Sequence, residues 1–210
     1  MIDAIIAACL WRAKVYNPGM PAEYDLKTSP ANAQRRPQHV LDEASTRQLI
    51  ERARVGHIAT LWDDQPFINP TTFWYDAERH AINFHSNLAG RVRANAEQQA
   101  RVCFEASEYG RLLPSNVALE FSLQYESVVA YGTALVLEDF AEKRRALYGL
   151  TSKYFPAMAA GREFRPITDQ ELKRTSVYAI RIESWSGKRN WAERADQSDE
   201  WPPLAEEWFR

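Results

Sequence analysis

The sequence has few cysteines, no excess of basic residues and no long hydrophobic run. Only Cys9 and Cys103 are present among 210 residues, so neither a disulfide framework nor a CxxC metal site can be built. The net charge of −2 argues against a general nucleic-acid or membrane-surface binder. The apolar run at residues 4–11 is too short to span a membrane. We therefore expect a cytoplasmic protein that binds neither nucleic acid nor membrane.

Several catalytic and cofactor-binding signatures are missing as well. The sequence contains no GxGxxG, no GxxxxGK[ST] and no nucleophile elbow with a serine–histidine–aspartate order. His57, His80 and His85 do not keep the spacing of a metal-ligand set. We expect no metal site, and a nucleotide would have to be bound by other means.

Aromatic residues are the abundant class, with 7 Trp, 9 Tyr and 9 Phe. Four of the tryptophans, Trp185, Trp191, Trp201 and Trp208, fall in the last 26 residues. Exposed indoles would form an adhesive patch, so we expect the tail to dock on the barrel or on the partner subunit.

Hydrophobic periodicity predicts a mostly β protein with inserted helices. A period of two, or a short β-branched run, indicates strands, and a period near 3.6 with capping residues indicates helices. The antiparallel order without a βαβ repeat favours a barrel. We expect an N-terminal extension at 1–40, a barrel domain at 41–192 and a tail at 193–210. The expected strands are 57–62, 66–75, 81–86, 101–106, 118–124, 127–137 and 177–182; 107–117 is a loop; the expected helices are 42–55, 87–98, 139–154 and 168–173.

A first candidate site is the segment from Phe84 to Arg91. A strand is predicted to end here and a helix to begin, with Ser86 or Asn87 as its cap. A helix N-terminus attracts anions, Gly90 lets an anion approach the backbone, and Arg91 offers a fork that fits a phosphate. These features predict a phosphate site. The alternative is an ordinary capped helix with a solvated arginine.

Two further segments combine aromatic and polar side chains. Thr71, Thr72, Phe73 and Trp74 lie on one predicted strand and would suit a flat ligand with hydrogen-bonding edges. The alternative is a strand that packs its aromatic rings in the core. The segment 185–191 places Lys188 and Arg189 between two tryptophans, so it could stabilise an anionic heterocycle or form a basic surface turn.

The order of these motifs along the chain resembles a known family. The sequence is similar to the FMN-binding split-barrel proteins related to pyridoxamine 5′-phosphate oxidase, over about residues 35–191. It is most similar to the branch that includes nitroimidazole-resistance proteins and flavin-nucleotide-binding proteins. The motifs that carry the resemblance are 55–61, 70–75, 84–86 with Gly90 and Arg91, 101–104, 125–129 with Gly132, 138–139 with 143–144, 166–168 with 171–172, and 187–188.

The resemblance implies a six-stranded antiparallel split β-barrel with short flanking helices, a homodimer, and FMN at the dimer interface. It implies that Ser86 and Arg91 contact the FMN phosphate and that Lys188 and Trp191 lie near the ring. Ser127 would approach from the same or the partner chain. His85 matches a histidine associated with cofactor chemistry in the nitroimidazole-resistance branch, and is a candidate site residue. The residues expected along the flavin are Thr71, Thr72, Phe73 and Trp74.

The sequence departs from the family in two places. Val92 stands where many relatives have a lysine after the arginine of the phosphate motif, so one cation is lost unless Arg93 replaces it. The arginine and histidine that bind the substrate in true pyridoxamine-phosphate oxidases are not evident near the C-terminus. We expect an FMN-dependent oxidoreductase acting on a small organic substrate. The alternatives are a flavin carrier without turnover, a nitroimidazole-resistance-type reductase, or a structural dimer that has lost its ligand.

Overall fold

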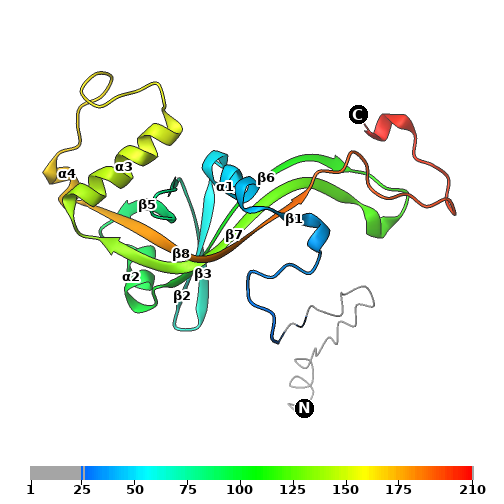
Figure 1. Cartoon of the computed structure of the whole chain (residues 1–210), viewed down its shortest axis with the longest axis horizontal. Helices are drawn as coiled ribbons and strands as arrows, with labels where there is room; N and C mark the ends of the chain where they lie inside the picture. Colours follow the sequence, from blue (N-terminus) through cyan, green and yellow to red (C-terminus); the bar gives the residue numbers. More distant parts are fainter. Residues whose placement is uncertain (1–24, 26, 210) are drawn as a thin grey trace, which may run out of the picture.

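The computed structural model describes residue 25 and residues 27–209. The expectations for residues 1–24 lie outside these described residues. One long antiparallel sheet dominates the fold (Figure 1). The strands are β1 (Val40–Leu41), β2 (Gly56–Trp62), β3 (Gln65–Thr71), β4 (Trp74–Asp76), β5 (Ala81–Asn87), β6 (Arg101–Leu113), β7 (Ser122–Leu137) and β8 (Thr175–Asn190). The helices are α1 (Glu43–Arg52), α2 (Arg91–Gln98), α3 (Phe140–Tyr154) and α4 (Asp169–Lys173), with 3₁₀ turns η2 (Pro37–His39), η3 (Ala118–Glu120) and η4 (Glu206–Phe209).

The strand order explains why the sheet curls into a barrel. The order is β3-β2-β6-β7-β8-β5-β4, with β1 paired to β8, and all pairs are antiparallel. The two edge strands of this path, β3 and β4, are joined by only Thr72 and Phe73. Two edges connected by two residues must lie close together, so the sheet closes on itself there without hydrogen bonds between them. This confirms the antiparallel split barrel, with eight strands in place of the six that were expected.

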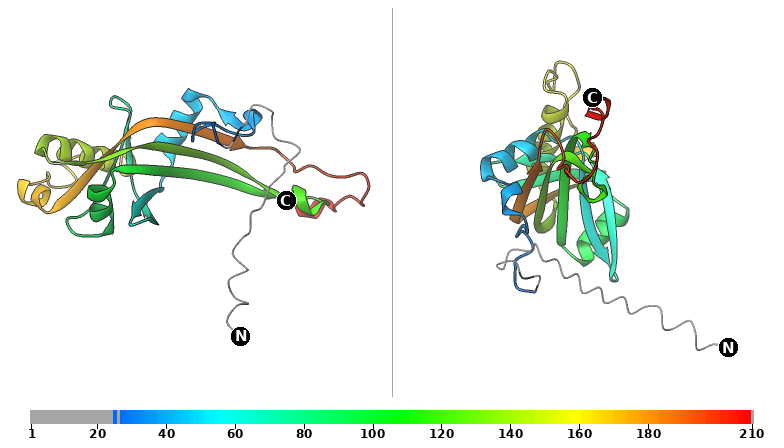
Figure 2. Two further views of the ribbon diagram at one scale, coloured as in Figure 1. Left: turned by 90° about the horizontal axis from the view of Figure 1, so that it is seen from below. Right: turned by 90° about the vertical axis from the view of Figure 1, so that its right-hand side faces the viewer.

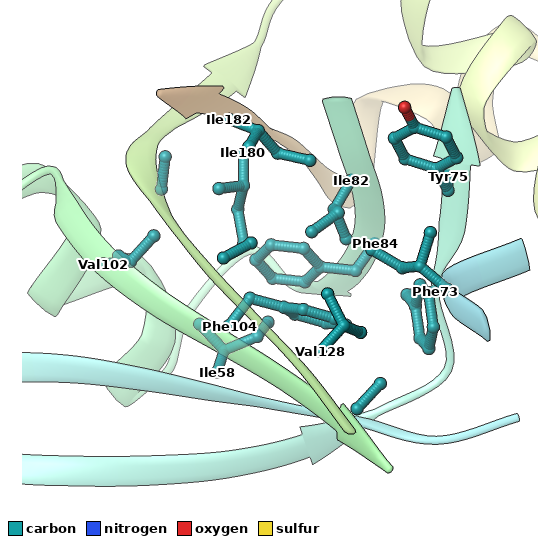
Figure 3. Packing of buried hydrophobic residues seen from close by; sticks show 14 of the residues in the cluster. Ile58, Phe73, Tyr75, Ile82, Phe84, Val102, Phe104, Val128, Ile180 and Ile182 are labelled. Atoms are coloured by element: carbon teal, nitrogen blue, oxygen red, sulfur yellow. The ribbon is translucent and has the colours of Figure 1, made fainter. Parts of the chain in front are cut away.

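The barrel interior is filled by aromatic and branched side chains from several strands (Figure 3). Phe73 meets Phe104 edge to face with ring centroids 4.8 Å apart, and Phe84 stacks on Tyr178 at 4.6 Å. All four rings are fully or almost fully buried. Aromatic pairs of this kind add about 0.5–1.5 kcal/mol to the gain from burial.

Three predicted helix starts are confirmed and one is wrong. Asp42 caps α1 and Asp139 caps α3, each accepting a hydrogen bond from the third residue beyond it, and Thr168 forms a complete capping box on α4. The helix expected at 87–98 begins only at Arg91, with Gly90 as its N-cap and no side-chain cap. The chain continues β5 through Asn87 because Ser86 and Asn87 pair with β8 instead.

The central strands are longer than predicted. The expected loop at 107–117 is wrong, since β6 continues to Leu113, and the two strands expected at 118–124 and 127–137 are the single strand β7 after the turn η3. β8 extends to Asn190, so residues 185–191 are not a turn. Because these strands pair with one another, their backbone hydrogen bonds are satisfied, and polar residues can lie along them. The predicted irregularity at Gly132 is confirmed, as the β7–β8 register shifts there and a Cβ would lie 2.0 Å from the oxygen of Arg181.

The prediction of a single strand at 66–75 is also wrong, because two strands lie there. β3 pairs with β2 and β4 pairs with β5, on opposite edges of the strand path. The break falls at Thr72 and Phe73, where the chain crosses from one edge to the other. A local pattern of alternating residues does not reveal such a crossing, because both halves have the same periodicity.

The strands β6, β7 and β8 extend beyond the barrel as a curved arm (Figure 2). The C-terminal tail contacts the outer end of this arm, where Ser115 Oγ donates to the oxygen of Asp196 at 2.6 Å and Asn116 Nδ2 to that of Ser198 at 2.8 Å. Trp201 and Trp208 nevertheless remain mostly exposed. The tail therefore docks through polar contacts, and this chain does not cover its indoles.

A buried ion pair fastens the β4–β5 hairpin to α3. The Asp76 side chain is 2% exposed, and Arg145 donates to both of its carboxylate oxygens at 3.0 Å. Removing Arg145 leaves the buried carboxylate with only the more distant Arg79, at 3.9 Å, and two backbone N–H groups to compensate its charge. We expect Arg145→Met to lower the free energy of unfolding by about 2–4 kcal/mol in urea titrations.

The neighbouring arginine provides the control for this prediction. Arg144 forms an ion pair with Asp169 at 2.6 Å in which the Asp169 side chain is 67% exposed. Exposed pairs contribute about 0–1 kcal/mol, so Arg144→Met should change the stability by less than about 1 kcal/mol. Equal losses in the two variants would contradict the special role of the buried carboxylate.

Candidate functional site

The N-terminus of α2 has the properties of an anion site. Its first intrahelical bond runs from Ala94 N to the oxygen of Gly90 at 3.1 Å, so the N–H groups of the three preceding residues have no acceptor within the helix. No side chain caps them. Gly90 has a φ of 155°, a conformation that residues with a Cβ rarely adopt. The backbone thus presents donors and the positive end of the helix dipole to solvent.

Arg91 and Ser86 lie at this end of the molecule. Arg91 is exposed, and its guanidinium carbon lies 5.1 Å from the centre of the Trp62 ring and 5.4 Å from that of Phe67. Ser86 Oγ lies 3.1 Å from the hydroxyl of Tyr178. The rings of the β2–β3 hairpin support the arginine without neutralising its charge, so it can bind an anion.

The two residues after Arg91 make contacts with other parts of the protein. Val92 packs against the barrel core, so its position points inward and contributes no cation. Arg93 binds Glu97, and its Nη1 lies 3.3 Å from Ser176 Oγ. In this conformation Arg93 therefore does not act as a second phosphate ligand. Among the described residues, Arg91 has no carboxylate partner, unlike Arg93 in the same turn.

Thr72 and His85 come together in the wall of a cavity outside the barrel. The cavity has a volume of about 520 Å³ and lies where α3, α4 and the segment between them meet the end of β5. His85 is partly exposed, yet its partial burial lowers the pKa of the imidazole below its usual value. The ring is therefore neutral at pH 7, and Ser86, the next residue, points to the other face of the strand.

Phe73 and Trp74 do not face this cavity. The Phe73 ring is fully buried in the barrel core, and the Trp74 ring packs against Gly149 of α3 below the guanidinium of Arg145. Phe73 follows the alternative interpretation, in which the strand packs its aromatic rings in the core, whereas Trp74 is half-buried outside the core. Thr71, the last residue of β3, is half-buried and pairs with Gly56.

Ser127, Lys188 and Trp191 form a second group, on the arm. Ser127 and Lys188 are direct partners on β7 and β8, so their side chains lie on the same face. The Lys188 ammonium lies 5.3 Å from the centre of the Tyr125 ring and has no carboxylate partner among the described residues. Trp191 follows β8 and is 41% exposed.

The two groups are far apart within one chain. Ser176 pairs with Ser86, and Lys188 lies 12 positions further along the same strand. At about 3.3 Å per residue this corresponds to roughly 40 Å of strand. A flavin mononucleotide is far shorter than that, so Ser86 and Lys188 of one chain do not meet at one ligand.

Sequence reasoning missed the contribution of α3 and its surroundings. The Tyr154 hydroxyl donates to the oxygen of Arg54 at 2.6 Å and accepts from Phe73 N at 3.0 Å, and burial raises its pKa. Next to it, burial lowers the pKa of Lys153 to about 8, with its ammonium 3.5 Å from the centre of the Phe73 ring. The clustering of Lys153, Tyr154 and Phe155 at the end of the predicted helix was the available signal.

The comparison with protein families decides the relationship. The family model described as pyridoxamine 5′-phosphate oxidase matches residues 42–189. The chain belongs to this family. The match spans the seven strands from β2 to β8, apart from Asn190 at the end of β8, and leaves out β1. It confirms the relationship indicated by the order of the motifs. No curated protein matches the sequence.

Solved structures support the fold. The chain is similar to the flavocytochrome Anf3 from Azotobacter vinelandii, with a TM-score of 0.71, 22% identity and coverage of 80% of this chain and 76% of that one. It is similar to the FAD and heme binding protein from Mycobacterium smegmatis (0.67, 23%, 76% and 76%). It also resembles a putative 5-nitroimidazole antibiotic resistance protein from Bacteroides thetaiotaomicron (0.61, 20%, 71% and 86%). No helix in the described ranges is long and apolar enough to span a membrane.

Proposed function

We propose that this member of the pyridoxamine 5′-phosphate oxidase family is an FMN-dependent oxidoreductase with its flavin sites at the interface of a homodimer. The observation that carries the proposal is the uncapped N-terminus of α2 next to an unpaired Arg91. Free backbone donors and a bidentate cation are the groups that bind a phosphate monoester. Ser86 adds a hydroxyl on the same side.

The ring would lie between groups from two subunits. Thr71 and Thr72, where β3 ends, would lie along the ring in one chain, and Ser127, Lys188 and Trp191 would come from the arm of the other. Flavin relatives include proteins named for FAD, but a single phosphate site on α2 supports the mononucleotide for this chain. The flavin would supply the ability to accept and return a hydride or electrons.

The protein would supply binding, orientation and charge. Lys188 has no carboxylate partner among the described residues, so its ammonium is available to stabilise negative charge on a reduced ring. Trp191 would shield one side of the ring from water. His85 is held neutral at pH 7, which makes it suitable to accept a proton close to the site.

A homodimer is supported by the surface of the arm. Seven large hydrophobic residues there have exposed fractions between 41% and 92%. Exposed hydrophobic patches commonly mark protein–protein interfaces. Packing the arm against a second barrel would cover them and bring Lys188 towards the partner's anion site. The exposed residues are Tyr109, Leu112, Leu119, Phe121, Trp191, Trp201 and Trp208.

Val92 keeps a second function under consideration, a flavin carrier without turnover. One cation in place of two weakens phosphate binding and suits reversible exchange. Anaerobic reduction distinguishes the two functions. We expect NADH or NADPH to bleach the flavin absorbance of the loaded protein, and a nitroimidazole or quinone acceptor to restore it repeatedly. Flavin that is bound but never reduced over hours would favour the carrier.

A further inference from the structure

The segment between α3 and α4 exposes an apolar loop, residues 155–161. All of these residues are exposed, and none of them has a charged, hydroxyl or amide side chain. Phe155 and Met158 are 57% and 41% exposed. The loop keeps its shape through its own backbone, because Met158 N donates to the oxygen of Phe155 at 3.0 Å and Gly161 N donates to that of Phe164 at 2.7 Å. An exposed apolar surface of this kind is typical of a protein–protein contact.

A complementary surface lies at the opposite end of the molecule (Figure 1). The outer ends of β6 and β7 and the C-terminal tail enclose a groove of about 800 Å³, which we call the tip groove. Its apolar walls include Leu112, Phe121 and Trp208, which are between 62% and 79% exposed. Arg111 and Glu193, which also line the tip groove, form an ion pair at 3.4 Å and balance each other's charge. The tip groove therefore suits an uncharged, apolar occupant.

The proposed flavin site determines how two chains would lie along one another. It brings Lys188 of one subunit to the anion site of the other, at the level of Ser176, which pairs with Ser86. A two-fold axis that exchanges these two levels passes near Ile182, midway between them on β8. The subunits are then antiparallel, with the arm of each beside the barrel of the other.

The same axis brings the tip groove to the apolar loop. Ile182 pairs with Gly132, and Leu123, on the wall of the tip groove, lies nine positions further along β7. This separation corresponds to roughly 30 Å of strand. The same distance in the other direction passes Thr175, where β8 begins, and reaches α4. The apolar loop lies at this end of the molecule, between α3 and α4 (Figure 1).

We infer that the apolar loop of each subunit inserts into the tip groove of the other, with Met158 against Phe121 and Trp208. The inference rests on the proposed dimer and adds a contact that joins its two ends. Two-fold symmetry makes the contact reciprocal, so each dimer forms it twice. Methionine adapts its shape to its surroundings, and its sulfur makes favourable contacts with aromatic rings. The tail that forms one wall of the tip groove lies beyond residues 42–189, the part of the chain that the family model matches.

Disulfide cross-linking of the full-length protein tests the contact directly. In a background with Cys9 and Cys103 replaced by serine, Met158→Cys is combined with Phe121→Cys. These positions lie at opposite ends of one chain, so a disulfide between them can only join two subunits. We expect more than half of the protein to become a covalent dimer under mild oxidation. Met158→Cys with Leu135→Cys is the control and should stay monomeric on a non-reducing gel, because Leu135 is also 41% exposed but lies outside the tip groove.

The dissociation constant of the dimer provides an independent measurement, by sedimentation velocity. Met158→Asp places a charge in an apolar contact and should raise this constant by about tenfold or more, as should Trp208→Ala. Because the two side chains meet, the double variant should dimerise little more weakly than either single variant. Gln99→Asp adds the same charge at an exposed position between α2 and β6, and should leave the constant within about twofold.

The outcomes distinguish this contact from the proposed function. A dimer that binds FMN but forms no disulfide between positions 158 and 121, or that tolerates Met158→Asp, would overturn the contact and leave the flavin proposal intact. Additive effects of Met158→Asp and Trp208→Ala would show that the loop and the groove touch different surfaces, which would also overturn it. A protein that stays monomeric at every concentration would overturn both the contact and the proposed dimer.

Discussion

Replacing Arg91 by alanine is expected to weaken FMN binding by about tenfold to a hundredfold and to leave the fold intact. A hydrogen bond between charged groups contributes about 1.5–3 kcal/mol, which corresponds to this range. Arg91 is exposed and forms no ion pair among the described residues, so its removal disturbs only ring contacts with Trp62 and Phe67. Quenching of FMN fluorescence during titration measures the affinity.

Arg101→Ala is the matched control for Arg91→Ala. Arg101 begins β6 and is exposed, and its one ion pair within the described residues is with the exposed Glu183 at 3.3 Å. Its removal takes away the same charge from the chain without touching α2, so FMN affinity should stay within about twofold of the wild type. An Arg91→Ala protein that binds FMN as well as Arg101→Ala would show that the phosphate is bound elsewhere.

The second large effect is complementation between two inactive variants. If each site takes Arg91 from one subunit and Lys188 with Trp191 from the other, then Arg91→Ala and the double variant Lys188→Ala/Trp191→Ala should each bind FMN poorly. A mixed dimer of the two has one site in which all three residues are native and one in which all are replaced. Half of the sites in purified mixed dimers should therefore bind with wild-type affinity.

Differently tagged chains, expressed together and purified over both tags, provide these mixed dimers. The control is a mixed dimer of Arg91→Ala with Arg101→Ala. In this dimer one site lacks only Arg91, and the other site keeps Arg91, Lys188 and Trp191. If mixed dimers of the two defective variants bind no better than either parent, the site residues act from the same chain. The separation of roughly 40 Å along β8 argues for two chains.

The local signals in the sequence predicted the ends of several elements correctly. The capping residues Asp42, Asp139 and Thr168 act within a few positions of themselves, so their effect can be inferred without knowledge of the fold. The antiparallel barrel also followed from short alternating segments without a parallel repeat. The length of β6, β7 and β8 did not follow, because their outer halves are stabilised by pairing with one another and not by burial.

For the candidate site, too, local sequence signals predicted only part of the arrangement. The capping role predicted for Ser86 and Asn87 was wrong, since both stay in β5 and no side chain caps the helix, whereas the phosphate contacts expected of Ser86 and Arg91 remain predictions. Phe73 points into the barrel core and Trp74 packs against α3, and no local pattern marks the crossing from β3 to β4 at which the two residues lie. The cavity under α3 joins residues from five separate segments, which only the closed barrel brings together.

The proposed role of the arm explains the concentration of tryptophans near the C-terminus. The tail binds the outer end of β6 and β7 through Ser115 and Asn116, yet Trp201 and Trp208 stay exposed. Trp208 lines a groove of about 800 Å³ next to Phe121 and Leu112. Large aromatic residues at the centre of an interface contribute most to its stability. In a dimer these side chains would be the part of the arm that holds the second subunit.

Native mass spectrometry of the protein after incubation with FMN tests the central claim most directly, because it reports the number of chains and of bound flavins in the same particle. The account predicts a dimer that carries two FMN molecules, whereas the Arg91→Ala dimer needs about tenfold to a hundredfold more FMN to reach the same occupancy. A monomer that retains FMN, or a dimer that takes up none at saturating concentration, would contradict a flavin site shared between two subunits.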